Sequence, residues 1–447
     1  LDSAPIFTKH TFANQYSRPT TVEWLLGVAF FLCPATAWLL IPGTLSWSDA
    51  FFLAAILLFL IHVALNRTSL QVPIFIFIAA AFFIIAGLAS FINNTSPLNL
   101  INWLKFLISL FAIPVVIMWM TSEDRESIDR MLWFWMAGTC VSALVAILSK
   151  YGILVPFLYD KAADFAGRPG GLTFHPNSLS YTCALLVPVA IYLAVTVHAK
   201  TARWISIAAI ALLVDGILVS GSRGSLLAAF LGSLVWLPNP FKRFMHRSDF
   251  IALAVGALTI TAVTFFILLS DKPFADPTSA LSRLFGQSNQ TQLSNDARSR
   301  AAENAYAKFE AAPIFGQGFE DIRISHNGGL QILQCSGIVG ATGILLWWTG
   351  MIGCWLWLRL RGLALKQAVY RELMLLQMFQ AIAVIVIVNG TVEPFLTDRN
   401  GYFPFGLLLG LWLSARSQQM TQNRLDIQST SFKNTNTLIA SRITKPH

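Results

Sequence analysis

Two short glycine-rich motifs contain arginines placed to bind an anion. Arg223 lies in the segment SGSRGS (220–225), and Arg168 lies in GRPGG (167–171). Glycines let backbone N–H groups approach a ligand closely, and a helix that begins near Gly224 adds partial positive charge. Together with a guanidinium, these groups form a site suited to phosphate oxygens. The alternative is a structured turn whose arginine extends to lipid headgroups, and the spacing alone leaves both open.

A third arginine, Arg298, lies on a helix predicted over 297–312, which Asn295 or Asp296 can cap and Pro313 ends. One face of this helix carries four residues at helical spacing: Arg298, Ala302, Ala305 and Phe309. Arg300 lies on the opposite face, so we expect Arg298 to point toward the protein and Arg300 toward solvent. An inward arginine requires an anionic partner, which is either a loop carboxylate or a substrate diphosphate.

Two histidines lie in loops near these motifs. His326 lies in SHNGG (325–329), directly before an apolar run, and His175 precedes another. A neutral imidazole titrates at about pH 6.5 and can accept a proton from a sugar hydroxyl group. Either histidine can equally have a structural role. Asn327 is a supporting candidate beside His326, and Asp215, about two turns before Arg223, can orient that arginine or make a structural polar contact.

The sequence contains little that indicates a metal or nucleotide site. The only adjacent acidic pair in these loops is Glu320–Asp321, and no spacing of His and carboxylates resembles a closed metal site. There is also no phosphate-binding GxxxxGK[ST] motif and no GxSxG nucleophile motif. We therefore expect neither a metal centre nor ATP or serine-hydrolase chemistry.

These residues belong to a chain whose composition is that of a membrane protein. Of its 447 residues, 55% are hydrophobic and 12% are charged, whereas soluble domains are about 25% charged. All five cysteines lie in apolar runs, which indicates core residues rather than disulfides or metal ligands. The formal charge of +9 is explained by basic cytoplasmic loops rather than by nucleic-acid binding. A soluble enzyme, a disordered protein and a disulfide-rich secreted module are excluded.

The apolar runs predict an all-α, polytopic membrane protein with about twelve transmembrane helices. Helices are predicted because a lipid-exposed backbone must satisfy its own hydrogen bonds, and the runs lack the alternation of a β-barrel. The predicted spans are 21–42, 48–65, 71–92, 98–120, 129–149, 178–197, 203–219, 224–238, 249–270, 329–358, 375–391 and 402–415. The stretch 329–358 is about 45 Å long at 1.5 Å per residue, so we expect it to tilt or bend near Gly337, Gly340 and Gly343.

The basic residues predict the orientation. Short loops on one side carry twelve Lys and Arg residues and those on the other side carry five, so both termini are predicted to be cytoplasmic. The resulting organisation is an N-terminal cytoplasmic segment (1–20), transmembrane helices one to nine (21–270), a large periplasmic loop (271–328), helices ten to twelve (329–415) and a polar cytoplasmic tail (416–447). The motifs described above then face the periplasm.

The order of these motifs resembles that of a known family. Arg168 is followed by Pro176-Asn177, then by GSRG (221–224), then by Arg298 fifteen residues before Pro313, and finally by GQG (316–318) and His326-Asn327. This pattern is similar to the bacterial O-antigen ligase/polymerase superfamily, and most closely to the O-antigen ligases. The specific residues lie within about 165–400. One departure is Ala302, where many relatives carry a tryptophan.

The resemblance implies an inverting C-type membrane glycosyltransferase of lipopolysaccharide assembly in the bacterial inner membrane. Such an enzyme moves O-antigen polysaccharide from undecaprenyl diphosphate to lipid A–core at the periplasmic face, without a metal or other cofactor. By this resemblance Arg223 and Arg298 hold the donor diphosphate, Arg168 is a further basic position, and His326 is catalytic. Glu393, in NGTVEP (389–394), matches a family acid. The expected partners are the lipid-linked donor, the lipid A–core acceptor and membrane lipids, with no nucleic acid.

Two other functions remain open at the level of sequence. An O-antigen polymerase or a protein O-oligosaccharyltransferase would use the same type of donor with a different acceptor. A flippase or transporter of lipid-linked sugar is the alternative from a different class, although we find no inverted repeat of broken helices in the sequence.

Overall fold

The computed structural model describes residues 20–236 and 289–421, apart from short gaps at 38, 42–44, 68–70, 125, 154–163, 166, 321–324, 365–369, 392 and 394–398. The predicted ninth span (249–270), the first part of the predicted periplasmic loop (271–288) and most of both tails lie outside the described residues.

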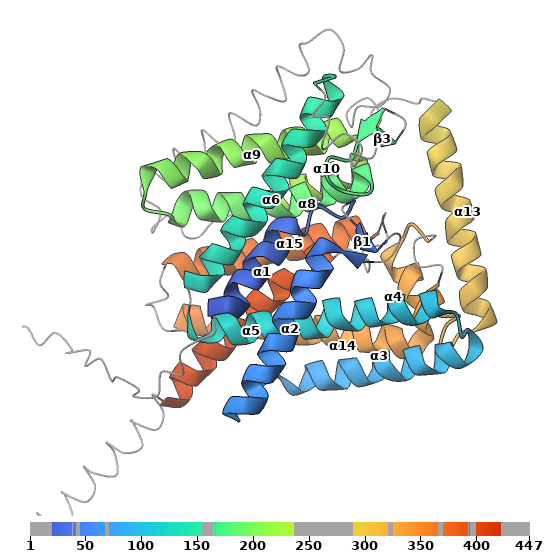
Figure 1. The fold of residues 1–447 in the computed structure, drawn as a ribbon, viewed down its shortest axis with the longest axis horizontal. Coiled ribbons are helices and arrows are strands. Elements are labelled where there is room, and N and C mark those ends of the chain that lie inside the picture. Colours follow the sequence, from blue (N-terminus) through green and yellow to red (C-terminus); the bar gives the residue numbers. More distant parts are fainter. Residues whose placement is uncertain are drawn as a thin grey trace, which may run out of the picture.

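Among the described residues, eight helices are long and apolar enough to cross a membrane, and they coincide with eight of the twelve predicted spans. They are α2 (Trp47–Asn66), α3 (Ile74–Asn93), the continuous pair α4 (Pro97–Leu107) and α5 (Ile113–Glu123), α6 (Glu126–Lys150), α8 (Pro176–Thr196), α9 (Lys200–Ser220), α14 (Gly328–Ala364) and α15 (Tyr370–Gly390). A π-helical turn, η1 (Ile108–Ala112), joins α4 to α5 just before Pro114, which has no backbone N–H to donate. The chain is thus a largely helical, multi-pass membrane protein (Figure 1).

Three predicted spans form shorter or more polar helices. They are α1 (Thr20–Leu32), α10 (Arg223–Leu234) and a helix over 403–421. The predicted extent of the first span, 21–42, is wrong. Helix α1 ends at Leu32 because Pro34 disfavours helical backbone in the residue before it. The chain then forms a small antiparallel pair, β1 (Leu39–Ile41) with β2 (Leu45–Ser46).

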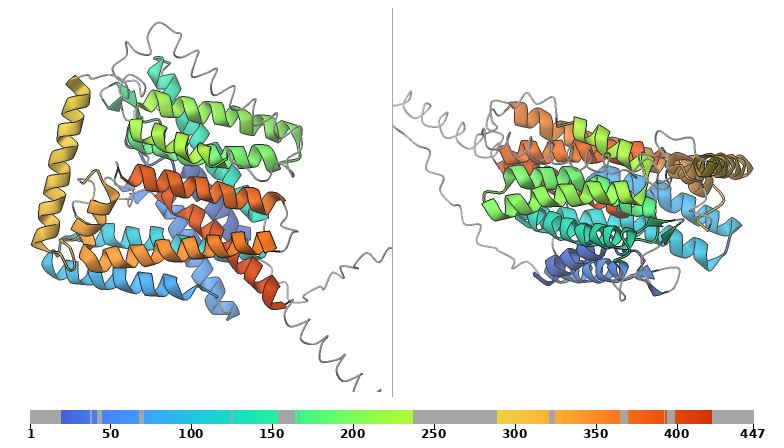
Figure 2. Two further views of the ribbon diagram at one scale, coloured as in Figure 1. Left: turned by 180° about the vertical axis from the view of Figure 1, so that it is seen from behind. Right: turned by 90° about the horizontal axis from the view of Figure 1, so that it is seen from above.

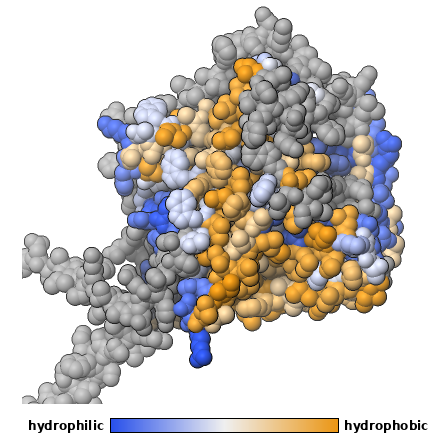
Figure 3. Space-filling view, viewed as in Figure 1, coloured by the Kyte–Doolittle hydropathy of each residue, from blue (hydrophilic) through white to orange (hydrophobic). Residues whose placement is uncertain are grey.

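Two groups of helices make up the hydrophobic core. In the larger group the almost wholly buried α8 packs against α6, α9, α10 and α15, and α1 packs against α2 and α6. In the second group α3 packs against α14. Helix α13 (Asn289–Ala311) runs across one end of these helices instead of along them (Figures 1 and 2). Figure 3 shows a hydrophobic band across this face of the molecule, with hydrophilic residues along the edge formed by α13.

Helix α14 contains a break that the chain fills with another segment. Gly337 has φ 59° and ψ −162°, which is not helical, so the predicted bend is found at this glycine. The break removes the helical hydrogen bonds of the N–H groups of Ile338 and Val339 to the carbonyls four residues earlier. The loop after α13 supplies the missing partners. It donates two hydrogen bonds, from Gln317 N to Gln334 O and from Gly318 N to Cys335 O. It accepts two others, from Ile338 N at Pro313 O and from Val339 N at Ile314 O. The half of α14 that begins at Gly328 is therefore joined directly to the end of α13.

The loop after α13 is also fixed to the connection between α3 and α4. The backbone N–H of Phe319 donates to Asn99 Oδ1 at 2.5 Å, and Asn102 Nδ2 donates to Phe319 O at 2.9 Å. Glu320 accepts hydrogen bonds from Asn94 and Ser96. These contacts hold α13 in place at one end of the bundle.

Candidate functional site

Glu393 lies at the centre of a cluster of polar side chains from four separate segments of the chain. Its Oε1 atom accepts hydrogen bonds from Asn177 Nδ2 at 2.5 Å and from Arg298 Nη2 at 2.8 Å. Its Oε2 atom lies 3.7 Å from Nδ1 of His326. The Glu393 side chain is 13% exposed, so its carboxylate is largely removed from water and is held by these partners.

Arg168 joins this cluster through Asn177. Its Nη2 atom donates to Asn177 Oδ1 at 2.6 Å, and its Nε donates to the carbonyl of Ser220 at 2.8 Å. The short antiparallel pair β3 (Asp164–Phe165) and β4 (Arg168–Pro169) places the arginine beside the start of α8. Asn177 thus accepts from Arg168 and donates to Glu393, which fixes the orientation of its amide.

Arg298 enters the cluster from α13, on the face that the helical spacing predicts. Its side chain is 30% exposed and pairs with Glu393, whereas Arg300 is exposed and contacts only a backbone carbonyl among the described residues. Ala305, on the same face as Arg298, is fully buried. The predicted start of this helix at Asn295 or Asp296 is wrong. The helix extends back to Asn289, because residues 289–296 contain no glycine or proline to interrupt it.

Arg223 lies next to this cluster at the first position of α10. Gly221, with φ 70°, ends α9 in the left-handed conformation, and the chain turns directly into α10. Arg223 Nη2 donates to Asn295 Oδ1 of α13 at 3.0 Å. Burial and the positive charge of Arg298 lower the pKa of Arg223. Two cations are therefore held close together where a helix N-terminus adds further positive potential.

His326 has an unusual backbone conformation, and its ring lies next to Glu393. Its φ of 45° is in the left-handed region, which a residue with a side chain adopts at a cost of about 1–2 kcal/mol. Its Nδ1 atom is buried, has no hydrogen-bond partner among the described residues, and faces Glu393. The side chain as a whole is 38% exposed, so the exposed part of the ring is the part away from Nδ1.

Asn327 positions His326 relative to Glu393. Its Oδ1 atom accepts from the backbone N–H of Leu330 at 3.0 Å and so caps α14, while its Nδ2 donates to Thr391 O at 3.1 Å. Thr391 lies two residues before Glu393. The asparagine therefore connects the start of α14 to the segment that carries the carboxylate.

His175, the second loop histidine of the sequence analysis, lies beside this cluster in a structural role. It caps α8 by accepting a hydrogen bond from the backbone N–H of Asn177 at Nδ1, at 3.1 Å. Burial lowers the pKa of His175, and the positive charges of Arg168, His326 and Arg298 add to this effect, with Glu393 opposing it. His175 is thus held neutral, as its role as a hydrogen-bond acceptor requires.

The structure does not bring every candidate into the cluster. Asp215 is half-buried on α9, and no hydrogen bond or ion pair joins it to Arg223 in the described part of the chain, so it does not orient that arginine. The residues next to Arg223 form a chain of hydrogen bonds that the sequence did not predict. Ser222 Oγ donates to Ser225 Oγ, which donates to Asn389 Oδ1. The small polar residues of SGSRGS were the only sequence signal for it.

The charges of the cluster favour an anionic ligand. Three arginines and one glutamate leave a formal charge of +2 on these side chains (three minus one), with His175 neutral. Guanidinium groups bind phosphate oxygens in a planar, bidentate manner. Within the ranges that the structure describes, no group of three or more His, Cys, Asp or Glu side chains is arranged to hold a metal ion.

Comparison of the sequence with protein-family models finds no matching family, and comparison with curated proteins finds no significant match.

Proposed function

We propose that this protein is an inverting, metal-independent glycosyltransferase that uses a polyprenyl-diphosphate-linked glycan as donor. In full, the proposal is an O-antigen ligase that transfers polysaccharide from undecaprenyl diphosphate to lipid A–core at the periplasmic face of the bacterial inner membrane. It rests on the motif order described above, which resembles that of O-antigen ligases. The single observation that supports it most is the convergence of Arg298 and His326 on Glu393, with Arg168 joined through Asn177 and Arg223 alongside.

In this proposal the arginines bind the donor diphosphate. In the free protein Glu393 is the anion that Arg298 contacts. An incoming diphosphate carries more negative charge than the carboxylate and competes for the same guanidinium. Arg223, which is half-buried near Arg298, provides a second contact. Fixed guanidiniums stabilise the charge that develops on the leaving diphosphate, a role that elsewhere is often filled by a metal ion.

His326 acts as the general base in this mechanism. A hydroxyl oxygen of the acceptor sugar attacks the anomeric carbon of the donor, and the bond from that carbon to the diphosphate oxygen breaks. The hydroxyl proton passes to the ring of His326, and the diphosphate leaves with the bonding electron pair. Glu393, 3.7 Å from Nδ1, stabilises the imidazolium that forms and holds the ring so that Nε2 receives the proton.

Reconstituted protein supplied with a polyprenyl-diphosphate-linked glycan tests this proposal. The sample is divided among three acceptors: lipid A–core, a second lipid-linked glycan and a pilin-like protein. Product on lipid A–core supports the ligase, and product on either other acceptor identifies a polymerase or a protein glycosyltransferase. Movement of the glycan across the liposome membrane without a covalent product contradicts an enzyme. Transfer should persist in EDTA, and its restoration by added Mg²⁺ after EDTA would contradict the metal-independent mechanism.

A further inference from the structure

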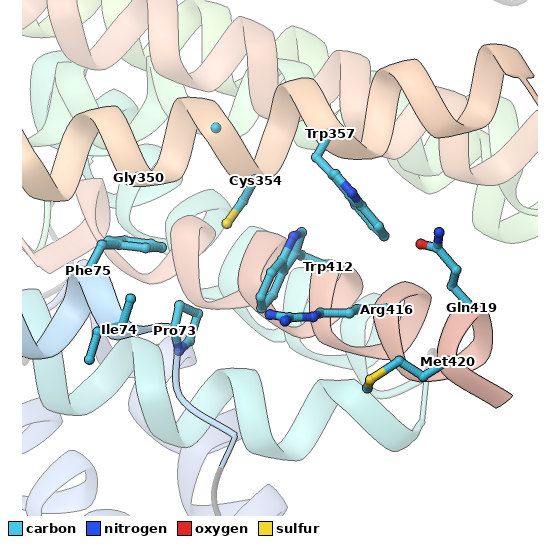
Figure 4. Close-up of a pocket in the computed structure, with 11 residues that line it drawn as sticks. Pro73, Ile74, Phe75, Gly350, Cys354, Trp357, Trp412, Arg416, Gln419 and Met420 are labelled. Carbon is cyan, nitrogen blue, oxygen red and sulfur yellow. The ribbon is translucent and has the colours of Figure 1, made fainter. Parts of the chain in front are cut away.

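A groove of about 590 Å³ lies at the end of α14 that is remote from the candidate site. Its walls are the start of α3, the later turns of α14 and the helix over 403–421. In Figure 4 Trp357 and Trp412 line the groove with their rings in an edge-to-face contact, and Arg416 lies beside Trp412. The volume is within the range of about 300–1,000 Å³ typical of ligand sites.

Of the two glycines of α14 that line the groove, Gly353 leaves space open and Gly350 does not. A side chain at Gly350 would collide with the ring of Phe75, which packs against this glycine. At Gly353, by contrast, an added Cβ meets nothing within 4 Å, so the groove is open above this residue. Large apolar side chains beside the groove are exposed, including Ile74 at 72% and Ile352 at 53%. In a membrane-spanning chain such side chains face lipid, so the groove opens to the acyl chains of the bilayer.

Two arginines bring positive charge to the groove. Arg416 lines it and lies 5.1 Å from the ring centroid of Trp412, and Arg361 lies 5.4 Å from that of Trp357. Arg361 also donates a hydrogen bond to the carbonyl of Ala415. In the described residues neither guanidinium forms a salt bridge with a carboxylate. A cation–π contact with an indole ring holds each guanidinium near the groove.

We propose that this groove binds one anionic glycerophospholipid, with an acyl chain over Gly353 beside Trp357 and Trp412 and the phosphate against Arg416. The apolar floor matches a hydrocarbon chain, and the uncompensated guanidiniums at the rim match a phosphate. Tryptophan and arginine together are typical of the membrane interface, where a headgroup meets its chains. This site is separate from the donor site and does not depend on the proposed transferase activity.

Native mass spectrometry of the delipidated full-length protein tests this site, with phosphatidylglycerol or phosphatidylcholine added at equal concentration. We expect the wild type to retain one phosphatidylglycerol with at least about tenfold preference over phosphatidylcholine. Arg416→Gln should remove that preference, and Lys200→Gln, an exposed charge at the start of α9, should leave it unchanged. Gly353→Leu, whose Cβ meets nothing within 4 Å, should occupy the groove and displace one bound lipid of either class.

Two results would overturn the proposal. One is an Arg416→Gln protein with the same lipid preference as Lys200→Gln, because the arginine would then contribute only to general membrane attachment. The other is a Gly353→Leu protein that melts at or above the temperature of the wild type and still binds the same number of lipids. Displacement of phosphatidylglycerol by an equal concentration of undecaprenyl phosphate would assign the groove to an isoprenoid chain and would also contradict it.

Discussion

Arg298 and Glu393 are 95 residues apart in the chain, and their Nη2 and Oε1 atoms lie 2.8 Å apart. Arg298 comes from a helix that lies across the end of the bundle, whereas Glu393 follows the end of α15. The pair therefore joins the segment after α15 to α13, the helix that lies across the end of the bundle. In the proposed function the same contact is the one that the donor diphosphate replaces.

Replacement of Arg298 should abolish transfer. We expect Arg298→Ala to lower the transfer rate at least about 100-fold, because a preorganised group that stabilises developing charge is lost. Arg300→Ala is the matched control, since that residue lies two positions away on the exposed face. The rates are measured with reconstituted protein and lipid-linked glycan. Equal rates for the two variants would remove Arg298 from the diphosphate site.

Neutralisation of Glu393 should separate binding from transfer. Glu393→Gln removes the negative charge that competes for Arg298, so we expect tighter binding of undecaprenyl diphosphate. Transfer should nevertheless slow at least about tenfold, because the imidazolium of His326 loses its counter-charge. Glu303→Gln is the control, because that carboxylate is exposed on α13 and lies outside the cluster. Weaker binding by Glu393→Gln would show that the carboxylate supports the diphosphate site.

Two substitutions of His326 should differ in stability but not in activity. His326→Ala and His326→Gly should both lower transfer by about 10²–10⁴-fold, the usual contribution of a general base. At φ 45° glycine relieves the strain that alanine retains, so the glycine variant should be more stable by about 1 kcal/mol. Melting temperature and transfer rate are measured on the same preparations. His198→Ala, an exposed histidine between α8 and α9, should behave as the wild type in both assays.

The neutral state of His175 should make the fold sensitive to acid. Because its pKa is lowered in the folded protein, the unfolded chain binds a proton more readily. The stability that neutral His175 provides is present above about pH 6.5 and is lost as the pH falls through the folded pKa. His175→Asn keeps an N-cap acceptor without a titrating group. The decrease in melting temperature below pH 6.5 should therefore be smaller in this variant, and an identical decrease would contradict the assignment.

The break in α14 should require glycine at 337. In Gly337→Ala the new Cβ would lie 2.4 Å from Ile314 O at a positive φ, so we expect a loss of at least about 2 kcal/mol in stability. Gly353→Ala in the same helix meets open space and should be neutral or stabilising by up to about 1 kcal/mol. Thermal unfolding in one detergent compares the two. Equal melting temperatures for the two variants would mean that the contacts between the break and the loop after α13 do not contribute to stability.

The sequence was enough to predict most of the spanning helices and the face of α13 on which Arg298 lies. Long apolar runs fix a helix because the bilayer permits few other structures, and helical spacing alone placed Arg298 and Arg300 on opposite faces. The limits of α1 and α13 were missed for local reasons. The apolar run past Pro34 resembles a helix in hydropathy only, and the polar residues 289–294 lack an apolar pattern although they form helix.

The arrangement of the cluster could not be predicted from the residues alone. Glu393 contacts Asn177 across 216 positions of sequence and Arg298 across 95. Periodicity defines the faces of a helix but not which helices are neighbours or how far each extends toward a common end. The hydrogen bonds at the break near Gly337 could not be predicted for the same reason, because their partners lie in the loop about 20 residues earlier. The resemblance singled out Glu393, and its contacts required the fold.

The four backbone hydrogen bonds at the break in α14 close the chain between residues 313 and 339 into a ring. Arg298 lies on the helix that leads into this ring, and His326 lies within it. Their separation is thus set by short-range geometry and only weakly by the tilt of the spanning helices. Bilayers of different thickness change helix tilt. The spacing between the cation and the imidazole should consequently stay constant in thin and thick membranes, even where the helices around them adjust.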